Sequence, residues 1–559
     1  MKKSKKHIGK NMRFFALVLG GMVVCILACM FVFGGSKKDL SETIIVEQTT
    51  ENVLKSEHAV ADVNAASTQA EQKDEKVQEH QTKRKEKRYF WSWSKSNIIE
   101  SDMYFTGRIE DGAIVLEWQT PAEEATLVIS EKYEKDTSEQ RENLKGTDTY
   151  RFTDGVHGKL YIFKLEYTVG QHTNTYTIVR RFLNFKDLSD IPVFYIDTED
   201  GIDPDFEKAK KPIKGSYGIS IDKNEYKQAI LNKNTPVKLR VRGNASAYGE
   251  KKSYKLVFAE KQDMLGLGEE YADKTWVLLG KDSLLKTYFG FELGKIVGME
   301  WEPRMRFVNV MMNGDWKGLY ILCESIKKHP KRVAIDEDGF LIESDAYYWK
   351  ETRPVFKSQL LIDVVRFTFK YPKIDADSDE RFIAITNRIA NIDELLLQHL
   401  DNAGDLIDYE TFAAWGIAHD LMGTTDGLGS NMFFYQESMG RETKLKMGPL
   451  WDFDSILQPN NNTDKAAFWA MSGTYLPILM EIQSFNDFYK KKAAEVLPSV
   501  EPAMKSALQK LRETPGLEDT LKLEQRILIK DKTLDEELDS FMKRLHDRVE
   551  LLNKSIQGV

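Results

Sequence analysis

A run of twenty residues without a charged side chain, from Phe14 to Phe33, most limits how the chain can be arranged. As a helix it would be roughly 30 Å long at about 1.5 Å per residue, which is enough to cross the hydrocarbon of a bilayer. Six cations and no acid precede it: Lys2, Lys3, Lys5, Lys6, Lys10 and Arg13. We therefore expect residues 1–13 to form a cytoplasmic tail, residues 14–34 an uncleaved single-pass anchor, and all later residues to be extracytoplasmic. A cleaved signal peptide and lipidation at Cys29 are the alternatives.

Composition limits the rest of the chain. Its 559 residues exceed what one core supports, which predicts several domains. The net charge of -8 argues against a nucleic-acid partner bound through phosphate neutralisation. Cys25 and Cys29 lie in the apolar run and Cys323 stands alone, so the exported part has no disulfide framework. An exported protein of this kind is typical of a Gram-positive bacterium.

Residues 35–95 are rich in Glu, Lys, Gln, Ser, Thr and Ala and poor in large apolar side chains. Such a segment cannot bury enough surface to fold alone, so we expect a disordered tether. Basic residues gather near its end, at Lys83, Arg84, Lys85, Lys87 and Arg88. This cluster at 83–88 is either a solvated stretch of linker or a contact to anionic cell-wall polymer or lipid headgroups.

Alternating apolar residues predict a small all-β sandwich over residues 96–186. Ile114, Leu116 and Trp118 share one strand face, and a second strand runs from Tyr161 to Val169. The pattern resembles a fibronectin type III or immunoglobulin-like module. Such modules are usually spacers, and we assign no chemistry to it.

Residues 190–559 form a larger domain whose first half is rich in predicted strands. Val237, Leu239 and Val241 alternate with three cations, Lys238, Arg240 and Arg242. One face of that strand is therefore apolar and the other is positively charged. A flexible polar turn containing Asn244 follows, and the strand after it carries Lys255. Neighbouring strands with cations around a turn of small residues suit a polyphosphate group, although a strand facing solvent is also consistent with the alternation.

Later segments complete an α+β plan with two lobes. Asn313-Gly314 between apolar runs predicts a β-hairpin, and residues 339–345 predict a further strand. Asp377 and Glu380 match a capping box before a helix whose apolar stripe steps by three and four residues from Phe382 to Leu396. A similar stripe over residues 534–552 predicts a long C-terminal helix that packs on the domain. A cleft between the strand-rich and helical parts would hold the functional site.

Two motifs carry candidate chemistry. Asp426 and Asn431 have the spacing D-x-x-x-x-N, which in protein kinases orients the attacking hydroxyl and holds Mg²⁺. Asp452 and Asp454 follow a predicted strand that ends at Met447, as the metal-binding Asp of D-F-G does. Oxygen ligands of this kind suit a hard divalent cation.

A glycoside hydrolase is a further alternative, because two carboxylates suffice for that reaction. The pair would be Asp452 or Asp454 with Glu324 or Glu343. Motifs of serine hydrolases, zinc peptidases, P-loop enzymes and dinucleotide-binding folds are absent from the sequence. We expect His419 to be a satisfied core or cleft histidine.

With these motifs in view, residues 190–555 resemble the CotH kinase-like family of bacterial spore-coat protein kinases. The resemblance is carried by four ordered segments: Arg240–Asn244 with Lys251–Lys255, Val308–Glu324, Asp426–Asn431, and Gly448–Asp454. It implies an atypical, two-lobed protein-kinase-like fold that uses ATP with Mg²⁺ or Mn²⁺. It also implies transfer of phosphate to Ser or Thr of a protein substrate, at the cell surface or in a coat.

Carried over by position, the resemblance assigns roles to individual residues. Asp426 would be the catalytic residue, and the metal would be held by Asn431, Asp452 and Asp454. Arg242, Asn244 and Lys255 would face the phosphates. Glu324 would be the partner of Lys255. Thr424-Thr425 stand where kinases have His-Arg, and Asp454 stands where D-F-G has Gly. A catalytically weak scaffold or adhesion protein of the cell envelope is therefore the main alternative.

Overall fold

The computed structural model describes residues 104–558 with gaps, the longest being 133–138, 185–189, 205–211, 221–234, 425–429, 459–466 and 469–474. All described elements belong to one compact unit, Arg84–Val559. The predicted tail, anchor, tether and basic cluster lie outside the described residues. None of the helices in the described part has the length and apolar character needed to cross a membrane.

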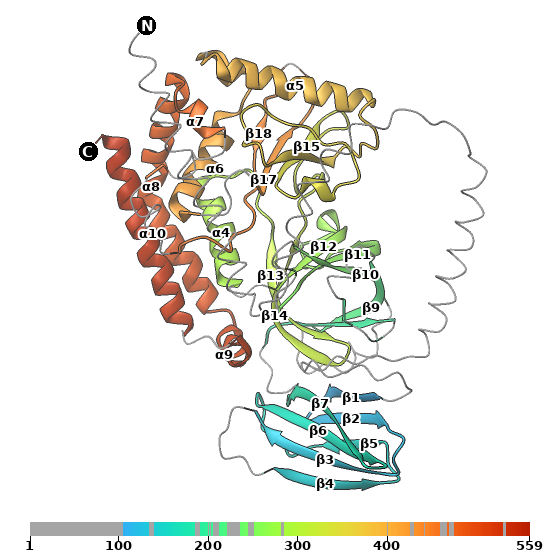
Figure 1. The fold of residues 1–559 in the computed structure, drawn as a ribbon. Helices are drawn as coiled ribbons and strands as arrows, with labels where there is room; N and C mark the ends of the chain where they lie inside the picture. The colour runs from blue at the N-terminus through green and yellow to red at the C-terminus, as the bar shows by residue number, and fades with distance from the viewer. Residues whose placement is uncertain are drawn as a thin grey trace, which may run out of the picture. The chain divides into compact units, whose positions relative to one another are not determined.

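The first described segment is all-β and forms two antiparallel sheets (Figure 1). One has the order β1-β2-β5 and the other β4-β3-β6-β7. Their facing side chains share a core that includes Trp118, Phe163 and Phe152. The predicted strands around Trp118 and Tyr161 correspond to β2 and β6. The bounds are β1 (Tyr104–Glu110), β2 (Ala113–Gln119), β3 (Glu124–Glu131), β4 (Gln140–Lys145), β5 (Thr149–Phe152), β6 (Leu160–Val169) and β7 (His172–Arg181).

The next strands close into a barrel in the order β10-β11-β12-β14-β13-β8-β9. Neighbours pair antiparallel except β8 and β13, which run parallel. The barrel closes because every strand has a continuous apolar inner face, and Val237, Leu239 and Val241 fill it as expected. The bounds are β8 (Val193–Thr198), β9 (Ile213–Ser220), β10 (Thr235–Arg242), β11 (Ser253–Gln262), β12 (Asp273–Leu279), β13 (Met305–Met312) and β14 (Asp315–Glu324).

The predicted hairpin joins β13 to β14. Asn313 and Gly314 both have positive φ, at 51° and 75°, which a two-residue turn of the primed type requires. A second, antiparallel sheet has the order β16-β15-β17-β18. Its strands are β15 (Phe340–Asp345), β16 (Arg366–Tyr371), β17 (Met432–Gln436) and β18 (Lys446–Met447).

Helices make up most of the remaining chain, and α4, α6, α8 and α10 pack against one another (Figure 1). Their apolar faces, one face of the second sheet and part of the barrel's outer face share one large core. The α-helices are α4 (Leu284–Val297), α5 (Glu380–Leu397), α6 (Tyr409–Met422), α7 (Leu476–Leu479), α8 (Gln483–Arg512), α9 (Leu517–Leu528) and α10 (Leu534–Gln557). Short 3-10 turns are η3 (Glu269–Tyr271), η4 (Tyr348–Lys350) and η5 (Asp401–Asp405). The chain therefore has the predicted α+β composition.

The structure corrects one helix start and supports the predicted C-terminal helix. Helix α5 begins at Glu380, and its N-cap is Asp379, whose side chain accepts a hydrogen bond from the Arg381 amide. Asp377 is therefore not part of a capping box, because the helix begins three residues after it. Helix α10 buries the predicted stripe, including Leu538 and Leu545, against the domain.

Helix α10 has a capping box of its own, which allows a direct test. The Glu536 amide donates to Thr533 Oγ1 at 3.2 Å, and the Thr533 amide donates to Glu536 Oε2 at 2.8 Å. Thr533→Ala removes the acceptor, so the first turn should lose about 1 kcal/mol of stability. Hydrogen–deuterium exchange should show faster exchange in that turn, whereas Thr533→Ser should exchange as the wild type does. Equal exchange in Thr533→Ala and wild type would contradict this role of the cap.

Candidate active site

Cations line the outward side of β10 and β11. Apolar residues of β10 point into the barrel, so Arg240 and Arg242 point outward, and Arg240 lies directly opposite Lys255 in the antiparallel register. Like charges directly opposite each other destabilise a sheet. None of these three cations forms an ion pair with a carboxylate among the described residues. A positive face of this kind in an acidic protein favours an anionic ligand.

The pKa of Lys255 responds to its burial and to these neighbouring positive charges. Its pKa is lowered to about 8, first by burial and then by the positive charges of Arg240, Lys370, Arg242 and Lys327. Each of these neighbours repels a proton on the Lys255 amine. A bound polyanion would relieve the repulsion and raise the pKa again.

Asn431 and Asp452 meet, although 21 residues separate them in sequence. Asn431 precedes β17, the chain returns through β18, and the Asn431 Nδ2 then donates a hydrogen bond to Asp452 Oδ2 at 3.1 Å. Both residues have positive φ, 57° for Asn431 and 67° for Asp452. Non-glycine residues rarely adopt this conformation, and it is concentrated at binding sites. The hairpin therefore brings two of the predicted metal ligands together.

Trp451 connects this pair to the cationic strands. The Arg242 guanidinium lies over the Trp451 ring at 5.0 Å from its centroid. Burial lowers the pKa of Arg242, and the negative charge of Asp452 acts in the opposite direction. The end of β10 and the Gly448–Asp454 segment are thus held side by side, with cation and carboxylate close together.

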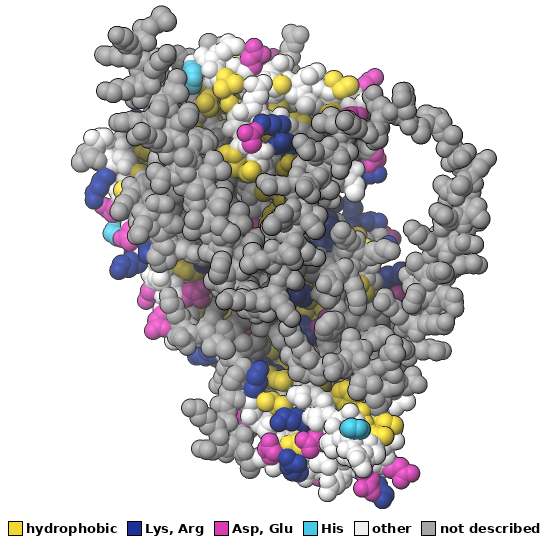
Figure 2. Space-filling view, viewed as in Figure 1, with side chains coloured by type: hydrophobic (Ala, Val, Ile, Leu, Met, Phe, Trp, Pro, Cys, Tyr) yellow, Lys and Arg dark blue, Asp and Glu magenta, His cyan; other side chains and the backbone are white. Residues whose placement is uncertain are grey.

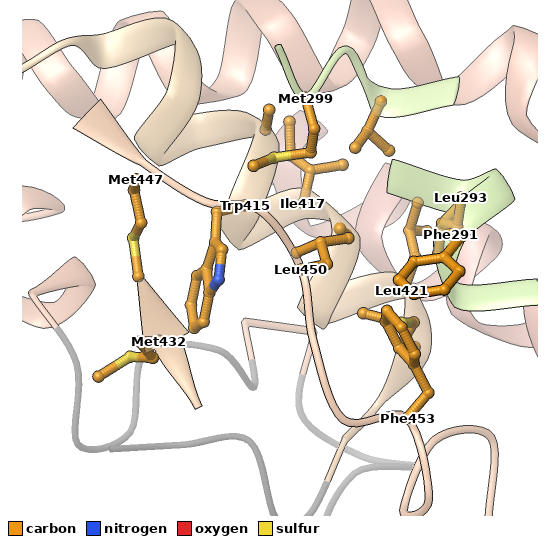
Figure 3. Packing of buried hydrophobic residues seen from close by; sticks show 14 of the residues in the cluster. Phe291, Leu293, Met299, Trp415, Ile417, Leu421, Met432, Met447, Leu450 and Phe453 are labelled. Carbon is orange, nitrogen blue, oxygen red and sulfur yellow. The ribbon is translucent and has the colours of Figure 1, made fainter. Parts of the chain in front are cut away.

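Helix α4 supports the Gly448–Asp454 segment from behind (Figure 3). Phe453 packs edge-on against Phe291 at 5.2 Å between ring centroids. It also lies so close to Gly290 that a Cβ there would come within 2.1 Å of the Phe453 ring. Only glycine allows this approach. Sequence reasoning missed this contact, although Gly290 and Gly294, one turn apart on a helix, were a visible signal.

Glu302 holds the same segment by a hydrogen bond. Its Oε1 accepts from the Leu450 amide at 3.0 Å, and its side chain packs on Gly294. The carboxyl is buried, and Oε2 has no hydrogen-bond partner among the described residues. Burial raises the pKa of Glu302 well above its usual value, because it disfavours the charged carboxylate. Sequence reasoning did not single out this residue.

The carboxylate of Glu343 faces the cationic side of the site from β15. It forms an ion pair with Lys370 of β16, and burial nevertheless raises its pKa. Positive charge on Arg242 also acts on Glu343. The second sheet therefore adds one mostly buried carboxylate and one lysine to the site.

The structure corrects the predicted partner of Lys255. Glu324 is fully buried, and Arg304 donates to both of its oxygens, at 2.9 and 2.7 Å. Arg332 lies 3.4 Å from the same carboxylate. Glu324 points with Leu322 to the inner side of the barrel, whereas Lys255 points outward, so the two do not pair. The prediction failed because the sequence alone did not establish which alternate residues of β14 face the barrel interior.

Comparison with known proteins identifies the family. The model of the family described as CotH kinase protein matches residues 239–556, more than half of the chain. The chain belongs to the CotH kinase protein family. A search of curated proteins found no match. A solved structure of a redesigned β-sandwich protein is 15% identical and covers 14% of this chain and 85% of its own, but its TM-score of 0.13 is too low to bear on the fold.

The other CotH motif residues are placed as follows. Asp426 and Asn244 lie outside the described residues. Asp454 is exposed, and its backbone carbonyl accepts a hydrogen bond from Lys286 Nζ of α4 at 2.7 Å. The described residues contain no group of three His, Cys, Asp or Glu side chains that could hold a metal.

His419 is a core histidine as expected, but it is not fully satisfied, because its buried Nδ1 has no hydrogen-bond partner among the described residues. It lies buried on α6 with its ring centroid 3.9 Å from that of Trp415. Burial lowers its pKa to about 3, so the ring is neutral. It therefore contributes packing rather than charge to this CotH domain.

The contact between α4 and the Gly448–Asp454 segment can be tested by adding one methyl group. Gly290→Ala should displace Phe453 and lower the free energy of unfolding by about 1–3 kcal/mol, the usual cost of overpacking. Gly440→Ala is a matched control, because its Cβ would meet no atom closer than 3.5 Å. Chemical denaturation measures both. A Gly290→Ala protein as stable as the control would contradict the packing described here.

Glu302 predicts a pH-dependent stability. Because its folded pKa is raised, the unfolded carboxyl ionises at lower pH, near 4.3, and wild-type stability falls as pH rises above that value. Glu302→Gln keeps the acceptor oxygen and cannot ionise. The variant should therefore gain stability relative to wild type as pH is raised from about 4 to 7, in denaturation experiments.

Glu495→Gln, at an exposed position of α8, is the control and should show no such trend. A difference between Glu302→Gln and wild type that is the same at both pH values would contradict a raised pKa of the buried Glu302.

Proposed function

We propose that this CotH-family chain is a membrane-anchored, extracytoplasmic phosphotransferase that uses Mg-ATP and modifies Ser or Thr of a surface or coat protein. The observation that carries the proposal is the hydrogen-bonded, left-handed pair Asn431 and Asp452 beside the cations Arg242 and Lys255. Carboxylate and amide oxygens suit Mg²⁺, and cations that form no ion pair among the described residues suit the phosphates. Residues 14–34 would hold the protein at the membrane.

The side chains at this site are chemically suited to Mg-ATP. Asn431 and Asp452 would hold the cation, with phosphate and water completing its shell. Bound Mg-ATP supplies the phosphoryl group and screens its charge. Arg242 and Lys255 would orient the phosphates, and Asp426 would orient the acceptor hydroxyl and accept its proton.

The proposed lobes are the barrel on one side and the second sheet with the helices on the other. Arg242 comes from the barrel, and Asn431 and Glu343 come from the second sheet. A nucleotide bound by all of them would lie between these two parts. This arrangement is the one that the two-lobed kinase-like plan requires.

The alternatives have less support from the same residues. A scaffold does not need two residues in a left-handed conformation that are hydrogen-bonded to each other. It also does not need cations directly opposite each other on neighbouring strands, which destabilise the sheet. For a glycoside hydrolase, Glu324 is unsuited because two arginines enclose it inside the barrel. Glu343 is paired with Lys370.

Substitutions of the two aspartates test the proposal. In Asp426→Asn, phosphate transfer from ATP to protein should fall by about 10²–10⁴-fold, because the residue orients and deprotonates the hydroxyl, while nucleotide affinity changes little. In Asp452→Asn, the magnesium-dependent part of nucleotide affinity should be lost together with transfer. Transfer is followed by phosphate incorporation into the purified protein and into Ser/Thr-rich protein acceptors.

Asp547→Asn, at an exposed position of α10, is the control and should behave as wild type. If both active-site variants transfer phosphate at the rate of this control, the proposed roles are wrong.

A further inference from the structure

The cations of the site continue away from it as a row along the outer face of the barrel. Beyond Arg240 and Lys255, Lys238 of β10 lies opposite Lys214 of β9 in the antiparallel register. Lys238 and Lys214 are exposed. Figure 2 shows Lys and Arg side chains gathered over the region where β10, β11 and β12 lie. We call Lys214, Lys238, Arg240 and Lys255 the cation row.

Two pairs in this row place like charges directly opposite each other, Arg240 with Lys255 and Lys238 with Lys214. Opposite residues of antiparallel strands have Cα atoms only about 4.5–5.5 Å apart, and like charges there are destabilising. In a protein of net charge -8, such crowding does not follow from composition. The row therefore favours a ligand that brings several negative charges.

The carboxylates of the described residues compensate the row poorly. Glu199 lies 3.9 Å from Lys214 in a pair that is about two-thirds exposed on both sides. Such pairs contribute little. Lys238 and Arg240 form no ion pair among the described residues. Asp273, farther along the barrel, is engaged by Lys327 at 3.1 Å.

The row extends beyond the cations that are assigned to the nucleotide phosphates. Lys238 is four residues before Arg242 on β10, about 13 Å along the strand at roughly 3.3 Å per residue. Arg242 and Lys255 are the cations assigned to the nucleotide phosphates. Lys238 and Lys214 thus lie beyond that site, on the same face.

We propose that the cation row binds inorganic polyphosphate, a linear chain of phosphates that runs along the outer face of β9, β10 and β11. Closely spaced cations need closely spaced anions, and a polyphosphate chain carries a negative charge on every phosphate without spacers. The described apolar side chains on the same face of β11 are Val257 and Ala259, so the described part of this face lacks the aromatic platforms on which bases of single-stranded nucleic acid stack. This binding does not require phosphotransfer. Lys214, Lys238 and Arg240 lie outside the set assigned to the nucleotide, and Lys255 is shared with it.

The test uses the full-length chain and fluorescently labelled polyphosphate, with anisotropy as the readout. The double variant Lys214→Gln/Lys238→Gln should bind polyphosphate on the order of tenfold more weakly at low salt. Its dependence of affinity on salt should also be shallower, because fewer counterions are released. Lys490→Gln/Lys491→Gln, two exposed lysines of α8, removes the same charge elsewhere and should bind as wild type does.

Mg-ATP affinity is measured in parallel and should be unchanged in the double variant, since Arg242 and Lys255 are retained. A protein that binds polyphosphate through the row but not ATP would support this inference while contradicting the proposed function. Three results would overturn the inference: no polyphosphate binding by wild type, equal weakening in the α8 control, or equally tight binding of a glycerol-phosphate polymer or a single-stranded oligonucleotide.

Discussion

The position of Asp452 depends on the close packing of Phe453 against the glycine face of α4. Phe453, directly after Asp452, lies against Gly290. Leu450, two residues before Asp452, donates a backbone hydrogen bond to Glu302. These two contacts fix the backbone on both sides of Asp452. The left-handed conformation of Asp452 is costly for a non-glycine residue, and the surrounding contacts can maintain it.

The second constraint is electrostatic. Cations on the outer face of β10 and β11 lie next to carboxylates from other elements, Asp452 and Glu343, which act on the charge of Arg242. Burial lowers the pKa of Lys255, and the positive charges of Arg240, Lys370, Arg242 and Lys327 lower it further. The cations of this site suit a polyanion, and the carboxylates of Asp452 and Glu343 suit a metal cation. The site is therefore suited to a ligand that combines the two.

Local patterns predicted much of the fold. Alternation identified β10, the Asn313-Gly314 turn identified the hairpin, and the apolar stripe identified α10, because each depends on neighbours a few residues apart. The meeting of Asn431 and Asp452 could be anticipated only through the resemblance to kinases.

Long-range contacts were not predictable in the same way. The ion pair of Glu324 with Arg304 depends on which side of β14 faces the barrel interior, and closure of the barrel decides that. The roles of Gly290 and Glu302 depend on where α4 lies against a segment more than 140 residues away in the chain. Neither arrangement has a local signature strong enough to identify it.

Calorimetric titration of the purified full-length protein with ATP, with and without Mg²⁺, tests the central claim most directly. The account predicts saturable binding that is tighter with Mg²⁺, because Asn431 and Asp452 would hold the cation beside the phosphates. Absence of binding at millimolar ATP under both conditions, or an affinity that does not respond to the metal, would contradict it.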